Sequence, residues 1–314
     1  MVPRCTITAK SLVMKKLLHF IVLLIVAQAA HAQVFTGLQH PESITGNTLF
    51  LYISDIGKEL TPTAKDGDGA IVKADLNGNI IDRNIAKFPL HAPKGAAIVK
   101  GNLWIADIDC IKGLALGLGA LIDSINFGKR VGATFLNDVV RRNDTSVFVT
   151  ATDQGVIYEL SLRKSKNIKA LPIPVIAGIN GIDYDPTTQR LAVNAMGNGE
   201  QKGGLYILYL QHQPIKIDTI PHVNGIFDGM QWVDAQHVLL SDWVDFSAPS
   251  GRLLKVNIQS GEAKVLKEND LPGPADIYYD KKNAQLWVPL MVTGHILKFN
   301  AGAPTNNIQQ KQKE

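Results

Sequence analysis

The feature that most constrains the fold is a repeat of short strand-like runs. Apolar runs separated by Gly, Asn and Asp turns recur in the same order six times between residues 41 and 299. Each unit starts at a polar or acidic step and continues into an apolar run such as LFLYISD, VFVTATD or HVLLSDW. Equivalent positions lie 43 to 52 residues apart, which matches one propeller blade of about 40 to 50 residues. The sequence therefore predicts an all-β, six-bladed β-propeller.

A two-sheet sandwich also contains many short strands, but it gives no reason for one motif to recur six times at this period. No segment between the runs has a 3.6-residue apolar period long enough for a core helix. Because an open propeller leaves a strand edge unpaired, we expect residues around 33 to 40 to add a strand to the last blade. The propeller is then expected to span residues 33–302, followed by a polar tail at 303–314.

The N-terminus has the pattern of an export signal. Met14-Lys15-Lys16 is basic, residues 17–26 are apolar, and Ala30-His31-Ala32 fits signal peptidase cleavage. An apolar stretch this short does not reach the roughly 20 residues of a membrane span. We expect residues 1–32 to be a signal peptide, with translation starting at Met1 or Met14. The mature chain would be periplasmic or secreted, without a membrane span, and monomeric.

Charge and cysteine content exclude several classes of protein. The whole chain has 32 Lys and Arg against 28 Asp and Glu, and the first 32 residues hold four bases and no acid. A mature chain without net charge argues against nucleic acid as a partner. Cys5 leaves with the signal segment, so no internal disulfide can form, and Cys110 is expected to be a buried structural thiol.

One polar side chain occupies the equivalent position of every unit. The innermost strand of a propeller blade runs along the central channel, so equivalent residues converge there. The six residues are Glu42, Lys94, Asn137, Asn180, Asp228 and Asp276.

Four of these side chains carry oxygen donors of the kind that hard divalent cations prefer. Glu42 and Asp228 offer carboxylates that balance a +2 charge, and Asn137 and Asn180 offer amide oxygens. The set lacks the His and Cys that zinc prefers. Ca²⁺ is the expected ion, with Mg²⁺ and Zn²⁺ as alternatives. Alternatively, each residue caps backbone groups at a turn, as Asn and Asp commonly do.

Several segments carry a family resemblance. They are Pro41-Glu42-Ser43, Asn137-Asp138, Asn180-Gly181-Ile182, and Phe227-Asp228-Gly229-Met230 before Ser241-Asp242-Trp243. With them, the mature chain resembles the regucalcin/gluconolactonase-like family of six-bladed propellers, and more distantly diisopropylfluorophosphatase and the paraoxonases. The resemblance implies a metal on Glu42, Asn180 and Asp228, with Asn137 contacting substrate or metal.

The implied activity is hydrolysis of a sugar lactone or related ester by metal-activated water. Asp228 would act as general base and Asn137 would orient the substrate, while Lys94 and Asp276 are further candidates for substrate contact. Val139 stands where the family has Gly after Asn-Asp, which alters the expected substrate wall.

The alternative function is a non-catalytic propeller that binds a ligand or protein on its channel face. An aromatic rim would favour that alternative, but the four Trp residues fall in strand runs, where core packing is expected.

Overall fold

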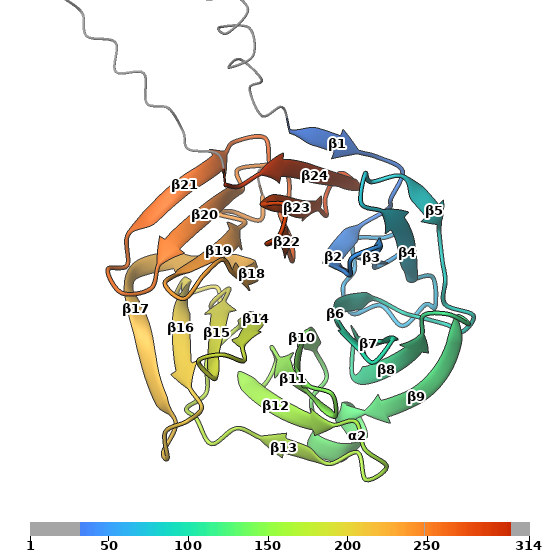
Figure 1. Cartoon of the computed structure of the whole chain (residues 1–314), viewed down its shortest axis with the longest axis horizontal. Helices are drawn as coiled ribbons and strands as arrows, with labels where there is room; N and C mark the ends of the chain where they lie inside the picture. Colours follow the sequence, from blue (N-terminus) through green and yellow to red (C-terminus); the bar gives the residue numbers. More distant parts are fainter. Residues whose placement is uncertain (1–31, 248, 303–314) are drawn as a thin grey trace, which may run out of the picture.

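The computed structural model describes residues 32–247 and 249–302, which form six four-stranded antiparallel sheets around a central axis (Figure 1). The predicted all-β, six-bladed propeller is confirmed. Residues 1–31 of the predicted signal peptide and the polar tail lie outside the described residues. No helix in the described part of the chain has the length and apolar character needed to cross a bilayer.

The first three blades follow one another along the chain. Blade 1 comprises β2 (Pro41–Gly46), β3 (Phe50–Asp55), β4 (Ala70–Asp75) and β5 (Ile80–Asp82). Blade 2 comprises β6 (Pro93–Val99), β7 (Asn102–Asp107), β8 (Cys110–Ala115) and β9 (Ala120–Asn126). Blade 3 comprises β10 (Leu136–Asn143), β11 (Ser146–Ala151), β12 (Val156–Ser161) and β13 (Ile168–Ala170).

The last three blades complete the ring. Blade 4 comprises β14 (Ile179–Asp185), β15 (Arg190–Ala195), β16 (Gly203–Tyr209) and β17 (Lys216–Gly225). Blade 5 comprises β18 (Phe227–Trp232), β19 (His237–Asp242), β20 (Arg252–Asn257) and β21 (Ala263–Glu268). Blade 6 comprises β22 (Tyr278–Asp280), β23 (Gln285–Leu290), β24 (His295–Asn300) and β1 (Gln33–Phe35).

The two ends of the described chain meet in blade 6, as expected from the need to cover a strand edge. β1 pairs antiparallel with β24, with Val34 opposite Leu297. The ring of Phe35 stacks on that of Trp287, with 5.4 Å between the centroids. The N-terminal strand therefore closes the propeller both by backbone pairing and by aromatic packing.

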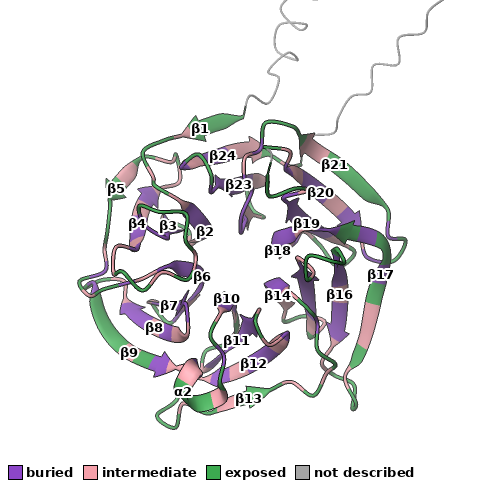
Figure 2. Ribbon diagram, turned by 180° about the vertical axis from the view of Figure 1, so that it is seen from behind, coloured by how far each residue is buried: buried purple, intermediate pink, exposed green. Residues whose placement is uncertain are grey.

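The hydrophobic core lies between neighbouring blades. The second strand of blade 3, β11, is buried along its whole length, whereas the outermost strand β9 of blade 2 is largely exposed (Figure 2). One apolar cluster joins Trp104 and Ile111 of blade 2 to Leu136 and Val147 of blade 3. Because each sheet buries both faces against its neighbours, its inner strands read as nearly continuous apolar runs.

A short helix, α2 (Phe127–Val131), connects blades 2 and 3. The Asn126 side chain accepts a hydrogen bond from the backbone N–H of Lys129, and Gly132 ends the helix at a φ of 76°. Both are ordinary capping signals. The helix buries Phe127 in the apolar cluster that blades 2 and 3 share.

Candidate functional site

A local irregularity at the start of the inner strands directs polar side chains to the channel. In each of the first five blades, the pairing between the first and second strands shifts register just after the strand begins. Such bulges bend a strand and re-aim a side chain. The residues at this point are buried, with exposed fractions of 6% or less, and are Glu42, Lys94, Asn137, Asn180 and Asp228. We call this set the channel ring.

The sixth position of the channel ring is held by Ala275, which corrects the phase expected for Asp276. In blade 3, the Thr150 hydroxyl donates to the carbonyl oxygen of Asn180 at 2.7 Å. The Ser241 hydroxyl of blade 5 makes the same bond to the carbonyl oxygen of Ala275, at 2.8 Å. Asp276 therefore stands one residue beyond the ring. Aligning the repeats by residue type misses this because β22 is short and begins only at Tyr278.

Within the described part of the chain, four oxygen atoms of the channel ring are buried without a hydrogen-bond partner. They are Glu42 Oε2, Asn137 Oδ1, Asn180 Oδ1 and Asp228 Oδ1. Buried polar atoms are normally paired, because losing hydration without compensation costs about 1–3 kcal/mol each. Turn capping does not explain these atoms, since a capping oxygen accepts a backbone N–H. Two carboxylates and two amides at one level fit a hard divalent cation.

The amides are essential to that fit. No group of three or more His, Cys, Asp or Glu side chains within residues 32–247 and 249–302 is arranged to hold a metal. An oxygen shell built on Glu42 and Asp228 would therefore need the amide oxygens of Asn137 and Asn180 as well.

Burial raises the pKa of both acids in the ring. Burial, reinforced by the nearby Asp228, raises the pKa of Glu42 well above its ordinary value. Burial also raises the pKa of Asp228 to about 7, against the opposing effects of a hydrogen bond from Trp243, the charge of Lys94 and the neighbouring side-chain amide of Asn180. A positive charge nearby would therefore stabilise the ionised form of both carboxylates.

Lys94 brings a positive charge into the ring, but its hydrogen bonds lead elsewhere. Its ammonium donates to the carbonyl oxygens of Pro62, at 2.6 Å, and Ala92, at 3.0 Å. It also lies 5.0 Å from the centroid of the Phe135 ring. Burial lowers the pKa of Lys94, while Glu42 acts in the opposite direction. Lys94 thus ties the β3–β4 loop to the ring, a connection that sequence patterns do not reveal.

Trp243, expected to serve core packing, does more than that. Its indole N–H donates to Asp228 Oδ2 at 2.8 Å, which leaves Oδ1 as the unpartnered atom of that carboxylate. Trp243 directly follows the last residue of β19, Asp242. This position could have been recognised in the sequence. The residue that directly follows the second strand of a blade lies next to the start of the inner strand, where the ring residue stands.

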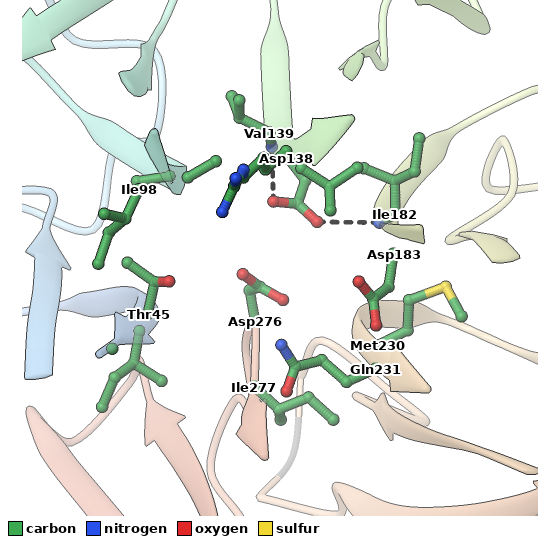
Figure 3. A pocket seen from close by; sticks show the side chains of 16 residues that line it. Thr45, Ile98, Asp138, Val139, Ile182, Asp183, Met230, Gln231, Asp276 and Ile277 are labelled. Carbon is green, nitrogen blue, oxygen red and sulfur yellow. Dashed lines mark hydrogen bonds between the residues drawn. The ribbon is translucent and has the colours of Figure 1, made fainter. Parts of the chain in front are cut away.

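Further along the inner strands lies a cavity of about 210 Å³, lined by a second set of acids (Figure 3). Asp138 accepts hydrogen bonds from the backbone N–H groups of Val139, at 2.6 Å, and Ile182, at 2.9 Å. Asp276 Oδ2 accepts one from the Ser43 hydroxyl at 2.6 Å. These bonds join blade 3 to blade 4 and blade 6 to blade 1. Asp276 therefore braces neighbouring inner strands on the cavity side of the channel ring.

Cys110 is partly exposed, contrary to the expected burial. Its sulfur lies 3.3 Å from the amide nitrogen of Asn126. Partial burial and the neighbouring Asp109 raise the pKa of the thiol to about 11. The thiol is protonated at neutral pH, which argues against a nucleophile.

Comparison with known proteins identifies the fold. No family model and no curated protein matches the sequence. Among solved structures, a luciferin-regenerating enzyme superposes with a TM-score of 0.61 at 14% identity, over 86% of this chain and 95% of its own. A streptogramin B lyase gives 0.56 at 13%, over 86% and 97%. The chain has the propeller fold of these enzymes. A structure of a nidogen/laminin complex gives 0.54 at 14%, over 73% and 79%.

Identities this low establish a common architecture and leave the chemistry to the site. The resemblance to the regucalcin/gluconolactonase-like family stays a prediction. Structures with this fold include enzymes as well as a chain from a nidogen/laminin complex.

Proposed function

We propose that the protein is a divalent-cation-dependent hydrolase that opens a lactone or a related ester. The main support for this proposal is one oxygen on each of Glu42, Asn137, Asn180 and Asp228 that is buried with no hydrogen-bond partner among the described residues. A chain that only needed a filled channel would place apolar or mutually bonded side chains there. The enzymes among structures with this fold add support by analogy alone.

The four oxygens would hold one cation, with Ca²⁺ as the first candidate. When bound, such an ion supplies Lewis-acid polarisation of a carbonyl group and of a water molecule. Glu42 and Asn180 would serve only as ligands. Asn137 would orient the substrate carbonyl as well, because its amide nitrogen can donate a hydrogen bond.

Asp228 would act as general base. Trp243 fixes Oδ2 at 2.8 Å, so Asp228 would take the proton of an attacking water at Oδ1, through the lone pair of that oxygen that does not face the cation. The water oxygen bonds to the carbonyl carbon, the ring C–O bond breaks, and the proton passes to the departing alkoxide. Lys94 would contribute positive charge where the oxyanion develops.

The alternative of a non-catalytic binding propeller keeps one supporting observation, the likeness to a chain of the nidogen/laminin complex. It predicts ligand binding without turnover. The two proposals separate on metal-dependent catalysis.

The test is metal content and thermal shift of the mature protein, with chelator and with Ca²⁺, Mg²⁺ or Zn²⁺ restored, followed by a lactone panel. We expect one ion per chain to stabilise the wild type and to leave Asn180→Ala and Asp228→Ala unaffected. Turnover should stop with chelator and in Asp228→Ala. Thr187→Ala, in the exposed turn after β14, is the control. Absence of ion binding, or turnover that survives in Asp228→Ala, would overturn the proposal.

A further inference from the structure

An apolar layer borders the channel ring at the mouth where the inner strands begin. The residue after each second strand occupies an equivalent position in all six blades. These residues are Ile56, Ile108, Thr152, Met196, Trp243 and Met291. Four of them, Ile56, Ile108, Trp243 and Met291, form one cluster of buried side chains with Ala92 and Ala275. We call this cluster the apolar collar.

The collar touches the ring directly on the side of blades 5 and 6. The Trp243 indole belongs to the collar and donates to Asp228 of the ring. Ala275 belongs to both, since it fills the sixth ring position. One sector of the ring is therefore apolar, next to the carboxylate proposed as general base.

The apolar surface continues outward from this sector. Phe246 is 61% exposed, and its ring centroid lies 5.2 Å from that of Trp243. Val292 is 45% exposed. A Cβ placed on Gly273 would stand 2.6 Å from the Trp243 ring and 2.9 Å from Val292 Cγ2. Glycine at 273 thus leaves the room in which Trp243 and Val292 lie close to the same backbone segment, so that together they form one apolar wall.

The collar offers few groups for a hydroxylated substrate. Thr152 is the polar member of the six equivalent positions, and its hydroxyl already donates to the carbonyl oxygen of Ile179 at 2.7 Å. A sugar lactone placed against such a wall would bury hydroxyl groups without partners, each a loss in affinity. An alkyl or aryl group placed there gains affinity with every methylene removed from water.

We propose that the substrate of this site is a lactone or ester with an apolar body, alkyl or aryl, rather than a polyhydroxylated sugar lactone. This inference rests on the proposed hydrolase function. The apolar body would lie against Phe246 and Val292, the exposed side chains next to the buried Trp243, and the carbonyl group would face Asn137 and Asp228.

The experiment compares δ-valerolactone, δ-octalactone and δ-decalactone with glucono-δ-lactone, using the mature protein with Ca²⁺ restored. We expect kcat/KM to rise about fourfold for each added methylene over the first few, which corresponds to about 0.8 kcal/mol per buried CH₂. Glucono-δ-lactone should be the poorest substrate. Phe246→Ser should lower kcat/KM at least fivefold for δ-decalactone and by a smaller factor for δ-valerolactone, which has no alkyl chain to lie against this side chain.

Leu118→Ser is the matched control, because Leu118 is 70% exposed in the β8–β9 turn, outside the collar. Leu118→Ser should leave kcat/KM unchanged for both δ-decalactone and δ-valerolactone. Calorimetric titration of the protein after chelator has removed its cation measures affinity without turnover. In this assay δ-decalactone should bind more tightly than glucono-δ-lactone.

The outcomes separate the two proposals. Turnover of all lactones without dependence on chain length, or preference for glucono-δ-lactone, would overturn the apolar substrate and leave the hydrolase standing. Binding of δ-decalactone without any turnover would overturn the hydrolase and support an apolar ligand at the collar. Neither binding nor turnover of any lactone would overturn both.

Discussion

Replacing Asp228 by asparagine should stabilise the metal-free protein and abolish cation binding at the same time. The asparagine keeps the shape of the side chain and an oxygen that can accept the Trp243 N–H. The substitution removes a buried carboxylate whose pKa lies at about 7 instead of 3.8. A residue kept for structure should lose stability when changed, whereas one kept for a ligand can gain it.

The magnitude follows from that pKa. At about 1.4 kcal/mol per pKa unit, keeping Asp228 ionised in the folded protein costs about 4 kcal/mol. The asparagine amide brings an unpaired donor that offsets about 1–3 kcal/mol. A net gain of about 1–3 kcal/mol remains at pH 8. The folded state favours the protonated acid, so wild-type stability falls as pH rises from about 4 to about 7, and the advantage of the variant disappears near pH 4.

Urea unfolding in chelator at pH 4 and pH 8 measures this difference. With Ca²⁺ at 100 times its dissociation constant, the wild type should gain about 2.7 kcal/mol and Asp228→Asn nothing. Asp242→Asn is the matched control in the same blade. Asp242 is also buried but pairs with Arg252 at 2.8 Å, so its loss should destabilise at pH 8.

A variant Asp228→Asn that is less stable than wild type at pH 8 would refute the reasoning. So would a difference in stability that stays the same at both pH values. Either result would mean that Asp228 is kept for the structure of the channel and not for binding a cation.

Three further predictions concern the surroundings of the ring. Trp243→Phe should weaken cation binding about tenfold, since a hydrogen bond to a charged group contributes about 1.5 kcal/mol; calorimetric affinity equal to wild type would contradict a positioning role. Lys94→Met should tighten cation binding at least tenfold, because a buried positive charge beside Glu42 and Asp228 repels the ion; unchanged or weaker calorimetric affinity would show that Lys94 does not oppose it. Phe35→Ala should lower the free energy of unfolding by about 2 kcal/mol through loss of the stack on Trp287; an unchanged urea midpoint would mean that β1 does not help to close the ring.

Much of the candidate site could be predicted because a repeat converts sequence position into spatial position. Glu42, Asn137, Asn180 and Asp228 are recognisable as equivalent from their spacing, and all four are buried with an unpartnered oxygen. The phase fails at blade 6, where residue type points to Asp276 but the hydrogen bond from the Ser241 hydroxyl marks Ala275. Residue type cannot distinguish two neighbouring positions when both lie near the start of an inner strand.

Two partners of the ring depend on contacts that leave no local pattern. Trp243 resembles any core aromatic until its N–H is found on Asp228. From the sequence, Lys94 is simply a base that faces the channel. The structure shows that its ammonium donates a hydrogen bond to the carbonyl oxygen of Pro62, 32 residues earlier.

Strand period and turn chemistry alone specify the number of blades, the strand order and most of the polar side chains on the channel. They can do so because they are local properties that recur in every unit. The folded arrangement was needed to show which oxygens lack a partner, which side of the ring is apolar, and which acids brace the inner strands. Those properties depend on atoms from different blades meeting at a few ångströms, and no spacing along one chain specifies them.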